Sequence, residues 1–322
     1  EPHFVDAVPV IAPTGVADDA DGERRGFLAD GKGGNASCNS CCDRGFEVWM
    51  CTPSDLYALN GSVHTVAQKV RVTASAPYFD PDLPRDLALD DMDVVWMRKD
   101  PPFNMGYIFA TYILDHTAKD TMVVNAPAGL RHMNEKMWAM QFPSLVPQTL
   151  VTQSMDDIRA FARSQGTVVV KPLDGNGGEG VFVVRHDDPN IGVIVELSTQ
   201  HGQRKVMAQR YLPEAAQGDK RIILVNGEAV GAINRIPTGV DHRGNMHAGA
   251  RVAATTIDAR DREICDTIGP LLRQAGQVFV GIDVIGGFLT EVNVTSPTGI
   301  HELNRLDNLC VEGMILDAVE SA

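Results

Sequence analysis

The sequence lacks the features that mark proteins of membranes and nucleic acids. No stretch reaches the roughly 18–20 apolar residues that a membrane-spanning helix needs. Basic residues are outnumbered, since 28 Lys and Arg face 42 Asp and Glu and the formal charge is −14. Nucleic acids and anionic membranes both bind clustered positive charge. We therefore expect no nucleic-acid or membrane partner, and an anionic ligand would require locally concentrated basic residues or a divalent cation.

A disulfide framework is also missing. Four of the six cysteines fall within residues 38–51 and the other two lie far along the chain. This distribution favours a reducing compartment, so we expect a cytoplasmic protein. Cys38, Cys41 and Cys42 invite a zinc interpretation, but no second Cys/His pair stands at the spacing of a zinc finger. The sequence therefore does not favour a zinc site.

Length and composition indicate a soluble globular protein with two or more domains, since the 322 residues are 44% hydrophobic and 22% charged. Residues 1–42 hold a candidate strand at Val8–Ile11 but otherwise show no apolar period, so we expect an atypical, disordered segment. From residue 43 to 128, short apolar strands alternate with helical patterns. This alternation predicts a parallel-sheet α/β domain, within which we expect a helix over Pro53–Asn60.

The most informative stretch is a glycine-rich loop between two β-branched runs. Residues 168–170 and 181–184 flank this loop, which follows Lys171 and holds four glycines. Runs joined in this way predict a β-hairpin, and a glycine loop beside a lysine can close on a phosphate. The Gly-x-Gly-x-x-Gly spacing from Gly175 also matches the dinucleotide fingerprint, but that motif must open a helix and this one leads into a strand. A phosphate-binding flap and an ordinary long hairpin both remain open.

A second hairpin, near the C-terminus, carries acidic residues. Glu291 and Asn293 are two residues apart in a strand, so they share one face. Asp283 ends the preceding strand, and it lies opposite Glu291 if the connecting loop has three residues, 286–288, but faces away if the turn has two. We expect the three-residue loop, because hard oxygen ligands on one face form a Mg²⁺ site. The alternative is a half-buried hairpin whose polar face meets solvent.

The remaining patterns place further elements between and around these hairpins. We expect a helix from about Met155 to Ser164 and a strand at Val193–Leu197. Asn226-Gly227 is a strong signal for a tight hairpin turn. Residues 237–250 are polar and rich in glycine, and their length suits a lid or a disordered loop.

Several motifs together resemble the prokaryotic glutathione synthetases, a family of the ATP-grasp superfamily, from about residue 43 to the C-terminus. The resemblance implies an N-terminal parallel-sheet pre-ATP-grasp domain (43–128), an ATP-grasp lid subdomain with the glycine-rich hairpin (129–205), and a C-terminal ATP-grasp subdomain with the metal and substrate sites (206–322). The motifs that carry it are Trp96-Met-Arg-Lys-Asp-Pro-Pro-Phe103, Lys171-Pro-Leu-Asp-Gly175, Gly218-Asp-Lys-Arg221, Arg243-Gly-Asn245 and Leu289-Thr-Glu-Val-Asn-Val-Thr-Ser-Pro-Thr298.

This resemblance implies an ATP-dependent carboxylate–amine ligase that joins γ-glutamylcysteine and glycine into glutathione through an acyl phosphate. It implies ATP as co-substrate and two Mg²⁺ ions, or Mn²⁺, as cofactors, and we expect a homo-oligomer. Two alternatives remain open. One is another ATP-grasp ligase with a different acceptor, and the other is a homologue that binds ATP without turnover.

The resemblance also implies residue roles, with a lid at 236–251 that excludes water. Guanidinium forks and backbone amides suit carboxylates. The implied catalytic residues are Lys171, Arg221 and Arg235. ATP would be bound by Lys136, Lys171, Gly177, Gly178, Gln209, Tyr211, Leu212 and Asp219. The metal would be bound by Asp283, Glu291 and Asn293. The other substrates would be bound by Arg98, Arg221, Arg235, Ser296, Pro297 and Thr298.

Residues 1–42 depart from the family, which begins with a buried strand and a leucine-rich helix. The helix position here holds residues 34–42, a run of Cys, Ser, Asn and Gly without an apolar period. We interpret this segment as a frame-shifted, mis-spliced or mis-translated start.

Overall fold

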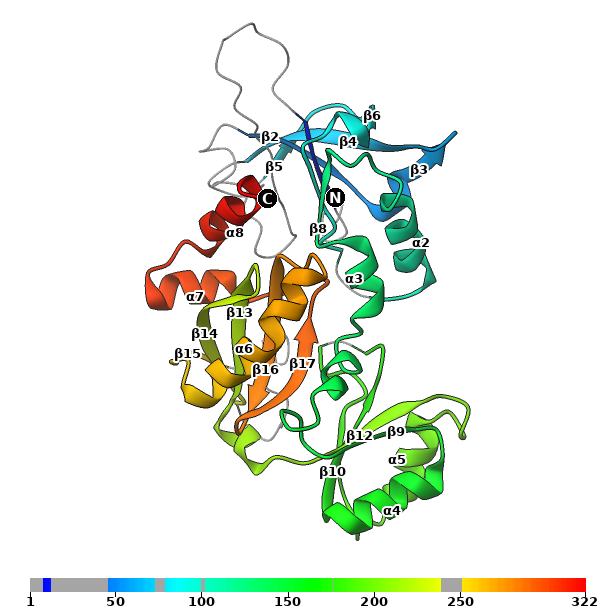
Figure 1. Ribbon diagram of the computed structural model, residues 1–322. Helices are drawn as coiled ribbons and strands as arrows, with labels where there is room; N and C mark the ends of the chain where they lie inside the picture. The colour runs from blue at the N-terminus through cyan, green and yellow to red at the C-terminus, as the bar shows by residue number, and fades with distance from the viewer. Residues whose placement is uncertain (1–7, 13–45, 73–78, 100–101, 176, 239–250) are drawn as a thin grey trace, which may run out of the picture.

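The computed structural model describes residues 8–12, 46–72, 79–99, 102–175, 177–238 and 251–322. These residues form three β-sheets. Figure 1 shows the N-terminal sheet at the top, the sheet of the C-terminal strands in the middle, and the sheet with the glycine-loop hairpin at the bottom. Cys38, Cys41 and Cys42 lie outside the described residues, as does most of the expected lid.

The first sheet contains the N-terminal strands in the order β3-β4-β2-β1-β7-β8, with β5 and β6 paired to β4. The expected strand near Val8 is confirmed as β1, which pairs with both β2 and β7. Helix α2 begins after Asn104, whose side chain accepts a hydrogen bond from the Tyr107 N–H. The strands are β1 (Val8–Ala12), β2 (Glu47–Cys51), β3 (Leu56–Leu59), β4 (Ser62–Val72), β5 (Phe79–Pro81), β6 (Arg85–Ala88), β7 (Val94–Trp96) and β8 (Met122–Val124), and the helices are η2 (Pro53–Asp55), η3 (Leu89–Asp91), α2 (Met105–Leu114) and α3 (Pro127–His132).

The mixed α/β class is confirmed, but the strand directions of this sheet correct the expected parallel arrangement. Only β7 and β8 form a parallel pair among the described strand pairs, and the others are antiparallel. Strands β3 and β4 are joined by a tight turn at Asn60 and Gly61, with φ of 53° and 91°. A two-residue turn can only join antiparallel strands. The predicted helix over Pro53–Asn60 is wrong beyond Asp55. Its first residues form the short helix η2, but β3 occupies its second half.

The second sheet has the order β11-β10-β12-β9 and is covered by helices α4 and α5. The predicted hairpin around the glycine loop is confirmed, with Val168 opposite Val184. The strand predicted at Val193–Leu197 is wrong, because this short apolar run forms α5, and periodicity alone does not separate a strand from a buried helix. Strand β12 pairs with β9 and β10, so a division at residue 205 separates it from its own sheet. The elements are β9 (Thr149–Thr152), α4 (Met155–Gln165), β10 (Thr167–Pro172), β11 (Phe182–Arg185), α5 (Ile191–Ser198) and β12 (Val206–Arg210), with η4 (Trp138–Gln141) preceding them.

The third sheet has the order β15-β14-β13-β16-β17. The tight turn predicted at Asn226 and Gly227 is confirmed, with φ of 48° and 79°. Helix α6 packs against this turn so closely that a Cβ on Gly227 would stand 2.5 Å from the carbonyl oxygen of Gly269. The elements are η5 (Pro213–Gln217), β13 (Asp219–Val225), β14 (Glu228–Ile236), β15 (Arg251–Ala254), α6 (Ala259–Gln274), β16 (Phe279–Ile285), β17 (Phe288–Asn293), α7 (Ile300–Asp307) and α8 (Val311–Glu320).

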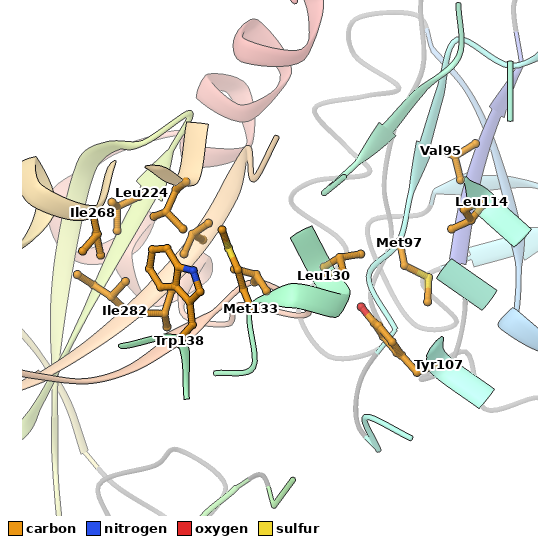
Figure 2. Packing of buried hydrophobic residues seen from close by; sticks show 14 of the residues in the cluster. Val95, Met97, Tyr107, Leu114, Leu130, Met133, Trp138, Leu224, Ile268 and Ile282 are labelled. Atoms are coloured by element: carbon orange, nitrogen blue, oxygen red, sulfur yellow. The ribbon is translucent and has the colours of Figure 1, made fainter. Parts of the chain in front are cut away.

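One hydrophobic cluster joins the first and third sheets. Figure 2 shows Trp138 beside Ile282 of the third sheet, while Leu130 and Met133 lie between this group and the N-terminal side chains. Trp138 and Leu130 are buried. The segment around α3 therefore holds the two sheets together, and the backbone that follows it leads to Lys136.

Candidate active site

The acidic hairpin β16–β17 brings its predicted residues together. Asp283 pairs with Glu291, as expected, but the predicted three-residue loop is wrong. The turn has two residues, Gly286 and Gly287, with φ of 57° and 76°, and the register shifts between Asp283 and Val284. The extra residue is Thr290, a β-bulge whose Oγ1 donates to the Asp283 carbonyl at 3.1 Å. The bulge therefore places Asp283 opposite Glu291, the arrangement that the three-residue loop was expected to give.

Two lysines from elsewhere in the chain approach this hairpin. Lys171 Nζ, at the end of β10, lies 3.3 Å from Glu291 Oε1. Lys136 Nζ lies 3.8 Å from the same oxygen and also binds the Glu135 carboxylate. Both lysines are buried, at 3% and 6% exposure for Lys136 and Lys171. Buried cations of this kind are found where an anion neutralises them, so the glycine hairpin and the acidic hairpin meet at one charged centre.

Asp283 is held by two arginines of the same sheet. Its carboxylate accepts from Arg221 Nε at 2.6 Å and from Arg221 Nη2 at 3.0 Å, which is a bidentate pair. Arg235 Nη2 lies 2.8 Å from Asp283 Oδ1 and 2.5 Å from Asp219 Oδ2. Asn293 Nδ2 adds a fourth contact at 3.3 Å. Arg221 and Arg235, expected to bind the substrates, are therefore ion-paired with acids of the site.

The charges of the centre shift its protonation equilibria. Burial alone would raise the pKa of Asp283, but Arg221 and Arg235 outweigh burial and hold this pKa well below its usual value. Burial likewise opposes ionisation of Glu291, and Lys136 and Lys171 lower its pKa. Both carboxyls are therefore ionised at neutral pH.

Asp219 behaves differently from these two acids. Burial raises its pKa to about 7, an effect that the charge of Arg235 only partly offsets and that the nearby Asp283 reinforces. Its Oδ1 atom is buried and has no hydrogen-bond partner among the described residues. Asp219 lies opposite Arg235 in the β13–β14 pair and accepts a hydrogen bond from its Nη2.

The glycine loop folds toward Lys136. Lys136 Nζ donates to the Gly175 carbonyl at 2.7 Å, and Asn134 Nδ2 donates to the Leu173 carbonyl at 3.1 Å. Gly177 and Gly178 have φ of 62° and 77°, in the left-handed region that glycine tolerates. The loop therefore turns back on itself next to the lysines, with its backbone unencumbered by side chains at these two positions.

The loop after β17 is held by arginines from two sheets. Arg98 Nη2 donates to the Pro297 carbonyl at 3.0 Å, and Arg221 Nη1 donates to the Thr298 carbonyl at 3.2 Å. Arg98 is 5% exposed. Because Arg221 also binds Asp283, the loop that includes Ser296 is tied directly to the acidic hairpin.

The predicted adenine segment lies at the end of β12, in the second sheet. Gln209 is buried and its Nε2 donates to Thr149 Oγ1 at 2.9 Å. The Tyr211 N–H donates to the Thr167 carbonyl at 3.1 Å, and Leu212 is buried. These contacts hold the segment within the second sheet, to β9 and to the start of β10.

Sequence reasoning missed one charged residue of the centre, Glu135. Burial and the nearby Glu291 raise its pKa, while Lys136 opposes them. Its carbonyl accepts from the Val292 N–H at 2.8 Å, which fixes the segment to β17. A pocket beside it is lined by Phe103, Met133, Asn134, Glu135, Leu173, Asp174, Gly175, Val294 and Thr295. The signal in the sequence was its place directly before Lys136 in Asn-Glu-Lys.

The donor set fits a hard divalent cation by its chemistry. Asp283 and Glu291 are ionised carboxylates on one face of the hairpin, and Asn293 adds an amide oxygen beside them. Within the described ranges no group of three or more His, Cys, Asp and Glu residues has the arrangement of a metal site. The site thus rests on two carboxylates and an amide, and Asp283 already accepts hydrogen bonds from three side chains.

The chain has an ATP-grasp domain, because the ATP-grasp family model matches residues 135–308 and solved ATP-grasp proteins share its fold. The chain superposes on the ATP-grasp ligase PsnB complexed with minimal precursor with a TM-score of 0.54 at 16% identity, over 79% of this chain and 86% of that chain. The D-cycloserine synthetase DcsG gives a TM-score of 0.53 at 16% identity, over 67% and 78% of the two chains. At this identity the likeness concerns the fold alone.

The sequence comparisons are more specific. The models of the prokaryotic glutathione synthetase N-terminal and ATP-grasp domains match residues 35–131 and 135–308. The glutathione synthetase of Thermosynechococcus vestitus is 50% identical over 82% of this chain and 86% of its own length, and that of Synechococcus elongatus is 49% identical over 86% and 90%. The chain belongs to the prokaryotic glutathione synthetase family and is an ATP-dependent ligase. None of its described helices is long and apolar enough to cross a membrane.

Proposed function

We propose that this protein joins γ-glutamylcysteine and glycine into glutathione at the expense of ATP. The cysteinyl carboxylate attacks the γ-phosphorus of ATP and ADP leaves, which yields an acyl phosphate. The amine of glycine then attacks the acyl carbon, and inorganic phosphate leaves. Both steps involve anionic oxygens, so charge stabilisation and positioning are the main demands on the protein.

The observation that carries this proposal is the approach of Lys171 and Lys136 to Glu291. A triphosphate and its metal need cations on one side and carboxylates on the other. The two buried lysines supply the cations, and Glu291 with Asp283 supplies the carboxylates. An ordinary long hairpin would leave Lys171 at the surface.

The residue roles follow from this arrangement. The two lysines with the Gly177–Gly178 turn bind the phosphates, and the end of β12, from Gln209 to Leu212, receives adenine, with Asp219 toward the ribose. Arg98, Arg221 and the Ser296–Thr298 loop bind the carboxylates of γ-glutamylcysteine, since bidentate guanidinium groups and backbone amides match carboxylate oxygens. Arg235 steadies the acyl phosphate from β14.

Asp283, Glu291 and Asn293 would hold Mg²⁺ or Mn²⁺ ions, which neutralise phosphate charge when bound. The remaining proposals concern the environment of the enzyme: it acts in the cytoplasm, as a homo-oligomer. Activity restored by Mg²⁺ after treatment with a chelator, and sedimentation of the purified protein, test the metal and the assembly.

The experiment that tests the function is ADP release with γ-glutamylcysteine and glycine together. Release should require both substrates, and omission of glycine should reduce it to the slow hydrolysis of the acyl phosphate. Other carboxylate–amine pairs serve as controls, because a preference for a different pair would assign another ATP-grasp ligase activity. ATP binding without turnover on any pair would instead support a catalytically impaired homologue.

A further inference from the structure

Phe279, the first residue of β16, is fixed by a side chain from the N-terminal sheet. Asn125 follows β8, and its Oδ1 accepts from the Phe279 N–H at 2.9 Å. Its Nδ2 donates to the carbonyl oxygens of Phe279 and Val294, both at 2.7 Å. Three hydrogen bonds from one buried amide therefore set the start of β16 and the end of β17 relative to the N-terminal sheet.

The ring of Phe279 supports a cation of the substrate site. The Arg98 Cζ atom lies 5.1 Å from the ring centroid, within the range of a cation–π contact. Trp96 packs on the same ring at 6.1 Å. Phe279 and Arg98 are 1% and 5% exposed. A cation–π contact is stronger when water is excluded from both partners, so this one constrains the guanidinium group more than a surface contact would.

Arg98 links the Phe279 ring to the loop after β17 through a hydrogen bond. Its Nη2 donates to the Pro297 carbonyl at 3.0 Å, next to the Thr298 carbonyl that Arg221 holds at 3.2 Å. A Cβ on Gly281 would stand 3.1 Å from both Arg221 Cδ and Pro297 Cβ. No free space therefore separates β16, the loop and the Arg221 side chain at Gly281. A shift of the Arg98 guanidinium would displace the Pro297 carbonyl to which it is hydrogen-bonded.

We propose that Phe279 is a positioning residue for recognition of γ-glutamylcysteine. Its ring holds the Arg98 guanidinium in the geometry that receives a substrate carboxylate, and Arg98 in turn fixes the Pro297 carbonyl. This inference rests on the proposed function. It concerns binding of the dipeptide and not of ATP, because Arg98 follows β7 of the N-terminal sheet, while the phosphate-binding lysines lie on the glycine hairpin and the segment after α3.

The test replaces the ring by an aliphatic side chain of similar size. Phe279→Leu should raise KM for γ-glutamylcysteine by about fivefold or more and leave KM for ATP within about twofold, since a desolvated cation–π contact is lost. Phe279→Tyr keeps the ring face and should retain the KM of the unchanged enzyme. The matched control is Phe46→Leu, which makes the same change in the same hydrophobic cluster and should change neither KM.

A double-mutant cycle shows whether Phe279 acts through Arg98. If it does, Arg98→Met should raise KM for γ-glutamylcysteine, and adding Phe279→Leu should raise it little further, because the supported group is already gone. Additive effects, or equal rises of both KM values in Phe279→Leu, would overturn the inference. Should Phe279→Leu fail to fold, Phe279→Met removes the ring while filling its volume. Absence of turnover in the unchanged enzyme would refute the proposed function instead.

Discussion

Two aspartates of this protein make bidentate ion pairs with arginine in different surroundings, and this contrast supports a sharp prediction. Asp283 accepts from Arg221 at 2.6 and 3.0 Å and is 4% exposed. Asp187 accepts from Arg185 at 2.9 Å twice, but its side chain is 53% exposed. Replacing each aspartate by asparagine removes one charge and keeps the shape. The two variants therefore separate the effect of burial from that of geometry.

Asp283→Asn should be strongly destabilising. Arg221 would keep its buried charge, and Arg235 Nη2, 2.8 Å from the same carboxylate, would lose one of its two acidic partners. Removing one partner of a buried pair costs about 3–5 kcal/mol, because the remaining charge is desolvated without compensation. Asp187→Asn should leave the free energy of unfolding unchanged within error, since exposed pairs contribute little.

The pH dependence has a defined sign. Burial raises the pKa of Asp283, but Arg221 and Arg235 hold it below its ordinary value in the folded protein. The unfolded chain then binds a proton first as pH falls, so the contribution of Asp283 is full above about pH 4 and is lost as pH falls through the folded pKa. Asp283→Asn lacks this titration. Its stability deficit should be largest near neutral pH and should shrink in acid.

The assay is urea unfolding of the unchanged protein and both variants between pH 3 and pH 7, with the midpoint and slope compared at each pH. A deficit of less than about 1 kcal/mol for Asp283→Asn at pH 7 would fall in the range of surface pairs and would refute the reasoning. So would a deficit that grows toward acid. The slope of the transition checks that both variants unfold in a comparable way.

Further predictions concern turnover and packing. Lys171→Ala and Glu291→Ala should each lower kcat by about tenfold or more, because each removes charge stabilisation of the phosphates; near-normal kcat in ADP release would contradict their roles. Gly129→Ala should lower the free energy of unfolding by about 1–3 kcal/mol, since its Cβ would stand 2.1 Å from Gln277 Nε2. Gly192→Ala in α5 serves as its control, because no heavy atom lies within 4 Å of that Cβ and a helical alanine is favoured over glycine; thermal unfolding of both variants measures the difference.

Local sequence signals predicted elements where the signal and its neighbours agree. Asn226-Gly227 gave the hairpin turn, and the β-branched runs around the glycine loop gave strands β10 and β11. The same kind of signal was present at Asn60-Gly61, where a helix was predicted instead. The run Val193–Leu197 illustrates a real limit, because four apolar residues interrupted by Glu196 carry no period that separates a strand from a helix.

The hairpin β16–β17 shows how a site depends on more than its local pattern. The prediction that Asp283 lies opposite Glu291 is confirmed. The prediction that a three-residue loop places them there is wrong. The observed register comes from a two-residue turn and a bulge at Thr290. A bulge depends on the pairing of the whole strand and on what packs beside it, and turn residues alone do not determine it.

By itself the sequence determined the family and the kinds of residues in the site, because turn glycines, strand runs and spaced motifs are local properties of the chain. Only the tertiary structure decided which charges meet. Lys136, Lys171 and Glu291 are distant in the chain, and the fold brings both lysine Nζ atoms within 4 Å of the Glu291 carboxylate. Arg221 and Arg235 bind Asp283 because strand pairing places them in one sheet, with Arg221 directly opposite Asp283 in the β13–β16 pair and Arg235 in β14 on the other side of β13. Sequence spacing alone does not give this register.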